Sequence, residues 1–233
     1  MKKKWIFFIL LPIFLIGLLW SIKISKLEIS GNSLYTDEEI EQLVFPNKMS
    51  RNTLYCFINT MRGKKESIPF VQDYSVSLLN PFKAEIIIYE KSIIGYVPYL
   101  GSNMYFDKDG VVVESSEKLL KGIPMVQGLS FKSVVLYKQL PVSEEKIFSY
   151  ILKLTQLISA YGIEVDLIKL NTQRDTVLMI GDIEVVLGDY SHTDAKIAEL
   201  HDILPNIQGL QGTLYLDSYT ALDGNKMYTF KKK

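Results

Sequence analysis

The 233-residue chain has few of the residues that cross-link proteins or bind metals, with one cysteine, Cys56, and two histidines, His192 and His201. One thiol cannot form an intramolecular disulfide, so the fold must depend on an apolar core. Cys56 stands among apolar residues, which favours a buried structural thiol over a reactive one. The histidines have no cysteine or third histidine at ligand spacing, which disfavours a zinc site.

An excess of one charge is also missing, because 26 Lys and Arg balance 26 Asp and Glu. This balance argues against a nucleic-acid-binding surface. The sequence contains no Gly-x-Ser-x-Gly element and no glycine-rich phosphate loop. Asp107 and Asp109 flank a turn, where aspartate is expected for local geometry alone. We therefore expect no catalytic residue, no metal ligand, no cofactor and no nucleic-acid partner.

One long apolar run is present, Trp5–Ile22, which has no charged residue and follows three lysines. A helix rising about 1.5 Å per residue would cover roughly 27 Å here, close to the hydrocarbon thickness of a bilayer. The run predicts a transmembrane helix over 5–22, with a cytoplasmic tail over 1–4 and the remainder exported. The alternative is a cleaved signal peptide, although no small-x-small cleavage pattern follows Ile22. The expected membrane-interface residues are Lys2, Lys3, Lys4, Trp5 and Trp20.

Residues 23–91 indicate a β-α-α-β-β unit. Thr36 and Glu39 form the sequence pattern of a capping box, which marks the start of a helix. Pro46 ends this helix. A Gly-Asn pair and an Asn-Pro pair mark turns next to alternating apolar residues. In order, we expect a strand over 24–30, a helix over 36–46, a helix over 53–65, and strands over 71–79 and 82–89.

Residues 92–230 indicate a second, mixed and mostly antiparallel β unit with one long helix, followed by a basic tail over 231–233. Helical spacing of apolar residues from Ile147 to Tyr161 predicts the long helix, with Ser143 as its N-cap. The other expected elements are strands over 104–107, 111–114, 131–137, 167–171, 176–180 and 183–187, a short helix over 193–204, and a terminal strand pair over 212–219 and 226–230. The predicted fold class is therefore α+β, with an N-terminal transmembrane helix and two compact units in series.

Short motifs in a particular order give the chain a resemblance to a known family. They are Ile24-x-x-Leu27-x-Ile29-x-Gly31-Asn32, Val76-x-Leu78-x-Asn80-Pro81, Ile86-x-Ile88-x-Glu90-Lys91, Tyr105-Phe106-Asp107-x-x-Gly110-Val111, Ile123-Pro124-x-Val126-x-Gly128, Leu187-Gly188 and Leu214-Tyr215-Leu216-Asp217. With the apolar run before them, they resemble the bacterial cell-division family FtsQ/DivIB. One departure is Ser92-Ile93-Ile94-Gly95, where the family usually has a proline and a small residue.

The resemblance implies a single-pass membrane protein with its N-terminus in the cytoplasm, a POTRA domain over 23–91 and a β domain over 92–230. It implies a non-enzymatic scaffold of the division septum, with small bitopic partners of the FtsL and FtsB/DivIC types and an indirect effect on septal wall synthases.

In the family the last strand of the β domain receives the FtsB-like partner as an added strand. The partner-binding residues expected from this are Tyr215, Leu216, Asp217, Tyr219, Leu222, Met227, Tyr228 and Phe230. The alternative function is a membrane-anchored, wall-modifying enzyme outside the cytoplasm. Such an enzyme would need a nucleophile–base pair or a metal cluster in the second unit.

Overall fold

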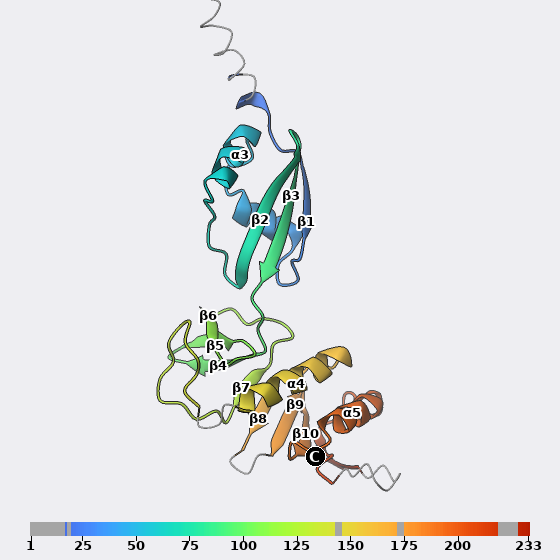
Figure 1. Cartoon of the computed structure of the whole chain (residues 1–233). Coiled ribbons are helices and arrows are strands. Elements are labelled where there is room, and N and C mark those ends of the chain that lie inside the picture. The colour runs from blue at the N-terminus through green and yellow to red at the C-terminus, as the bar shows by residue number, and fades with distance from the viewer. Residues whose placement is uncertain (1–16, 18–19, 143–145, 172–174, 219–227) are drawn as a thin grey trace, which may run out of the picture. The chain divides into compact units, whose positions relative to one another are not determined.

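The computed structural model describes residues 17, 20–142, 146–171, 175–218 and 228–233 (Figure 1). The chain divides into two units, Met1–Lys91 and Ser92–Lys233. Each unit has its own cluster of buried apolar side chains, drawn from residues 24–88 in the first and 94–216 in the second. We therefore describe the two units separately.

The first unit is a three-stranded sheet with two helices. Its elements are β1 (Lys26–Ser30), α2 (Asp37–Val44), α3 (Thr53–Met61), β2 (Val71–Asn80) and β3 (Lys83–Glu90). The middle strand is β3, which pairs in parallel with β1 and antiparallel with β2. The β2–β3 turn is closed locally, since the Phe82 N–H donates to Asn80 Oδ1 at 2.9 Å.

Local sequence signals explain where α2 begins and where α3 ends. The Glu39 N–H donates to the Thr36 hydroxyl at 3.2 Å, and the Thr36 N–H donates to the Glu39 carboxylate at 2.9 Å. The capping box predicted at these two residues is therefore confirmed. Helix α3 ends at Met61, earlier than predicted, because Gly63 turns the chain with a left-handed φ of 64°.

The core of the first unit follows the alternation of β3. Ala84, Ile86 and Ile88 are each at most 3% exposed and pack with Ile40 of α2 and Cys56 of α3. Cys56 is buried, as predicted. Burial raises the pKa of its thiol, which lowers the fraction of reactive thiolate at neutral pH.

The second unit is a nine-stranded sheet with two helices. Its strands are β4 (Gly95–Tyr99), β5 (Ser102–Phe106), β6 (Val112–Ser116), β7 (Met125–Gln127), β8 (Leu167–Leu170), β9 (Thr176–Ile180), β10 (Ile183–Gly188), β11 (Gly212–Tyr215) and β12 (Thr229–Lys232). They lie in the order β12-β11-β10-β9-β8-β7-β4-β5-β6. The pairs β4/β7, β7/β8 and β10/β11 are parallel, and the other neighbours are antiparallel.

The two helices of this unit, α4 (Lys146–Ala160) and α5 (Thr193–Ile207), are both fifteen residues long and lie beside the β8–β10 part of the sheet (Figure 1). Ile151 and Leu154 of α4 and Leu200 of α5 are fully buried in the core that the strands share. The predicted N-cap of α4, Ser143, lies outside the described residues.

The structure corrects the predicted fold class. The chain is a mixed α/β protein, mostly sheet, with four helices and twelve strands among the described residues. In that part of the chain, no helix has the length and apolar character needed to cross a membrane. The predicted transmembrane helix over 5–22 is therefore not shown. Of its residues only Gly17 and 20–22 are described, and the rest lie outside the described ranges.

Other elements also differ from the sequence predictions, which included no strand at β4 or β7. The expectation of one long helix is wrong, because α5 continues past its predicted end at Leu204 and buries Ile207. The strand predicted over 131–137 is a loop, whose Tyr137 N–H donates to the Val112 carbonyl at 2.7 Å. Strand β12 includes Lys231 and Lys232, which were assigned to a basic tail.

Candidate partner-binding edge

The C-terminal strands form one edge of the nine-stranded sheet. Strand β11 lies between β10 and β12, and among the described residues no strand lies beyond β12. Side chains alternate along this segment: Leu214 and Leu216 are fully buried, whereas Thr213 and Tyr215 are half-buried. This is the period of two that a strand imposes.

The backbone of β11 divides its hydrogen bonds between its two neighbours. The N–H groups of Gly212 and Leu216 donate to the carbonyls of Asp182 and Val186, at 3.4 and 2.8 Å, on the β10 side. Because successive residues of a strand turn their backbone polar groups to opposite sides, the odd-numbered residues of β11 face β12.

The same rule identifies the outward groups of β12. The Lys233 N–H donates to the Gln211 carbonyl at 3.0 Å, and the register pairs Leu214 with Phe230. The odd-numbered residues of β12 therefore bond to β11. The N–H and C=O groups of Phe230 and Lys232 point away from β11, to the outer edge of the sheet.

Gly212 lets β12 approach β11 closely. A Cβ atom at this position would lie 2.4 Å from the Lys231 carbonyl oxygen and 2.7 Å from the Phe230 ring. Real Cβ contacts of this length with backbone do not occur, so a larger residue would have to move β12. The backbone approach, rather than a special φ, is what requires glycine here.

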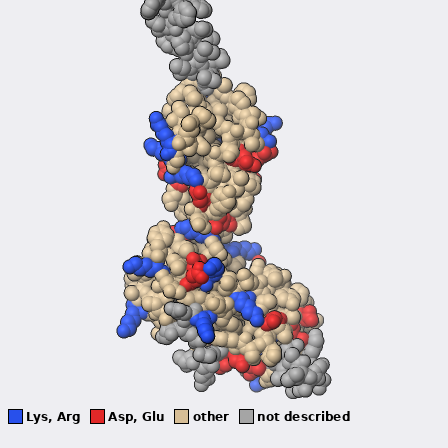
Figure 2. All heavy atoms as spheres, in the orientation of Figure 1, with Lys and Arg blue, Asp and Glu red and all other residues tan. Residues whose placement is uncertain are grey.

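Three of the exposed side chains at the edge are basic. Lys231, Lys232 and Lys233 are exposed, and the Lys231 ammonium lies 4.9 Å from the centre of the Tyr215 ring, within cation–π range. Elsewhere on the face of each unit shown in Figure 2, Lys and Arg are interspersed with Asp and Glu.

The structure separates the residues predicted to bind a partner. Tyr228 is 47% exposed, Asp217 is exposed, and Tyr215 and Phe230 are half-buried. Leu216 is fully buried, so its side chain belongs to the core and not to a contact surface. Three of the predicted residues lie outside the described ranges: Tyr219, Leu222 and Met227.

Among the predicted membrane-interface residues, only Trp20 is described. Its side chain is 47% exposed, and its carbonyl accepts a hydrogen bond from the Asn52 amide. Asn52 also caps α3, so this amide ties the residues before β1 to the first unit. The other four lie outside the described residues: Lys2, Lys3, Lys4 and Trp5.

A cluster of polar side chains in the second unit lies where α5 begins. The hydroxyls of Tyr150 and Thr176 are 2.8 Å apart, and the Tyr150 ring stacks on Tyr190 with centroids 3.8 Å apart. The buried Lys196 ammonium donates to the carbonyl and the carboxylate of Asp189, both at 3.1 Å. A hydrogen bond from Ser191, then that from Lys196, lowers the pKa of Asp189. These contacts join α4, α5 and the end of β10.

The residues considered for catalysis or metal binding have local contacts. Asp107 accepts the N–H groups of Asp109 and Val111 at 3.0 and 2.9 Å, which builds the β5–β6 turn. His192 precedes α5 with a left-handed φ of 51°. Within the described ranges, no group of three or more His, Cys, Asp or Glu side chains is placed to hold a metal ion.

Sequence reasoning missed two parts of this edge. It placed Lys231 and Lys232 in a tail, and it named no role for Gly212. The alternation of Thr229–Lys232 is too short to identify a strand by itself, whereas the glycine at the start of β11 was a usable signal.

No family model matches the chain, and no curated protein matches it significantly.

Proposed function

We propose that this chain is a non-enzymatic scaffold of the bacterial division septum, acting as FtsQ/DivIB proteins do. Its partners would be small bitopic proteins of the FtsL and FtsB/DivIC types, bound outside the cytoplasm at the cell membrane. Its effect on septal wall synthases would pass through these partners. The ordered sequence motifs support the proposal, and the observation that carries it is the outermost position of β12.

An open strand edge is suited to receiving another strand. The outward N–H and C=O groups of Phe230 and Lys232 would bond to the backbone of a partner segment. Exposed lysines beside them favour an acidic segment, since unlike charges attract across an interface and steer its approach.

A proline at Lys232 tests this edge with little effect on the fold. Lys232→Pro removes an N–H that points outward, while Lys231 and Thr229 keep their bonds to β11. Lys232→Ala is the matched control, because it removes the same charge and keeps the N–H. Full-length proteins would be used to recover FtsL-type and DivIC-type partners in a pull-down.

We expect Lys232→Pro to recover roughly threefold to tenfold less partner than Lys232→Ala, the equivalent of about one lost hydrogen bond. Equal recovery by the two variants would contradict binding at the β12 edge. No recovery by the unmodified chain, together with no concentration of a fluorescent fusion at midcell, would contradict the scaffold function.

A further inference from the structure

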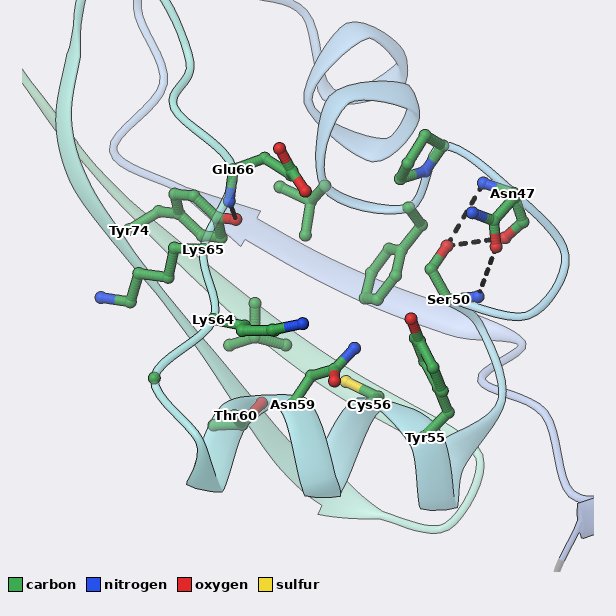
Figure 3. A pocket seen from close by; sticks show the side chains of 15 residues that line it. Asn47, Ser50, Tyr55, Cys56, Asn59, Thr60, Lys64, Lys65, Glu66 and Tyr74 are labelled. Carbon is green, nitrogen blue, oxygen red and sulfur yellow. Dashed lines mark hydrogen bonds between the residues drawn. The ribbon is translucent and has the colours of Figure 1, made fainter.

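A cavity in the first unit is lined by charged, polar and apolar residues. It has a volume of about 520 Å³ and lies between α3, the segment that follows α2, and β2 (Figure 3). The apolar part of its wall comes from Val44, Phe45 and Val76. This volume falls in the range of small-molecule sites.

The loop after α3 contributes opposite charges to the cavity. Figure 3 shows the Lys64 and Glu66 side chains directed into it; Lys65 also lines the cavity, but its side chain is directed away. Lys65 instead binds the Asp73 carboxylate at 2.6 Å. Alternate residues of an extended segment point to opposite sides, which explains the pattern.

The two charges that face the cavity are without a salt-bridge partner among the described residues. Neither the Lys64 ammonium nor the Glu66 carboxylate forms a salt bridge with another described side chain. The Glu66 backbone is nevertheless held in place, because its N–H donates to the Tyr74 hydroxyl at 3.0 Å. Both residues are exposed, so the loop presents to the same cavity a cation and an anion that no described side chain pairs with.

The spacing of the two residues that bear these charges gives a scale for a ligand that would bind both. The Cα atoms of residues i and i+2 of an extended chain are about 6.6 Å apart, and an extended dipeptide spans roughly the same distance. Two neutral groups from α3, the Tyr55 hydroxyl and the Asn59 amide, also point into the cavity and can bond to a peptide group (Figure 3).

We propose that this cavity binds a short zwitterionic peptide of about two residues, with its carboxylate on Lys64 and its ammonium on Glu66. Tyr55 and Asn59 would bind the peptide group between them, and small apolar side chains would face Phe45 and Val76. This site lies in the first unit and is independent of the proposed β12 edge.

The probe is L-alanyl-L-alanine, titrated into the full-length protein and followed by ligand-observed NMR. Lys64→Met and Glu66→Gln should each weaken binding roughly fivefold, as expected for an ion pair open to solvent. Lys65→Met is the matched control, since this neighbouring lysine points away from the cavity, and it should leave binding unchanged. Circular dichroism checks that all three variants fold.

Two further measurements locate the site and test its chemistry. Because Cys56 lines the cavity but is buried, its modification by a maleimide should be slow, and the bound dipeptide should make it slower. N-acetylation removes the ammonium of the dipeptide and should weaken binding as Glu66→Gln does. Amidation removes its carboxylate and should weaken binding as Lys64→Met does. Absence of binding, equal binding of the capped dipeptides, or equal losses in Lys64→Met and Lys65→Met would each overturn the proposal.

Discussion

Single buried polar residues in the second unit are held by specific partners. The hydroxyl of Tyr150 meets that of Thr176, and the ammonium of Lys196 meets the carbonyl and carboxylate of Asp189. Among the described residues, no buried side-chain nitrogen or oxygen is without a hydrogen-bond partner. Removing one member of such a pair leaves the other buried without a hydrogen-bond partner, which lowers the free energy of unfolding.

Tyr150→Phe tests this at high pH. Burial raises the pKa of Tyr150 from 10.0 to about 12, so the folded state keeps the phenol protonated after the unfolded state has lost its proton. The stability this contributes is complete below pH 10 and is lost as the pH rises from 10 toward 12. The stability of Tyr150→Phe should not show this decline at high pH. At pH 7 the variant should be less stable than wild type by about 1 kcal/mol, because the Thr176 hydroxyl loses its hydrogen-bond partner.

Urea unfolding at pH 7, 10 and 11.5 measures both effects, and Tyr161→Phe is the control at a more exposed tyrosine. Other tyrosines titrate in all three proteins, so the difference between proteins isolates Tyr150. The same decline in stability between pH 10 and 11.5 in wild type and Tyr150→Phe would contradict the prediction.

At the scale of elements, local signals determined the starts of α2 and β3, and neighbours determined the ends of others. Thr36 and Glu39 lie three residues apart and cap each other with no help from the rest of the chain. Helix α5 was predicted to end before Pro205, but burial of Ile207 stabilises one more turn. A local pattern cannot report that burial, because the core that includes Ile207 is built from residues far apart in the sequence.

Gly212→Ala tests how closely β12 must approach β11. The added Cβ would lie 2.4 Å from the Lys231 carbonyl, so β12 should separate from β11. We expect faster hydrogen exchange at the Lys231 amide and a partner recovery as low as that of Lys232→Pro. Gly209→Ala is the control, since a Cβ there meets no atom within 4 Å and only its left-handed backbone is strained. Unchanged exchange at Lys231 in Gly212→Ala would contradict this account.

At the scale of the whole molecule, the chain has two cores that share no residue. The first is centred on β3 and includes Ile86, and the second includes Leu178 of β9; both side chains are fully buried. Each unit therefore satisfies the main physical condition for folding by itself, a hydrophobic core of its own.

Calorimetry of single-core variants tests this separation. Ile86→Ala and Leu178→Ala should each lower one of two unfolding transitions by about 2–5 kcal/mol, through lost burial and a cavity. Each substitution should leave the unfolding transition of the other unit unchanged. In the double variant, both transitions should be lowered, each by the amount seen in the single variant. A single transition lowered by either substitution would show that the units unfold together.

By itself, the sequence determined features that depend on neighbours a few residues apart. These are the capping box at Thr36, the buried alternation of Ala84, Ile86 and Ile88, and the turn at Asn80-Pro81. The candidate edge was predicted only as a segment. The tertiary structure decided that Leu216 faces the core and that Phe230 and Lys232 direct their backbone outward. It also directed the side chains of Lys64 and Glu66 toward the same cavity. These outcomes depend on strand order, register and packing, which join residues far apart in the chain and leave no local trace in the sequence.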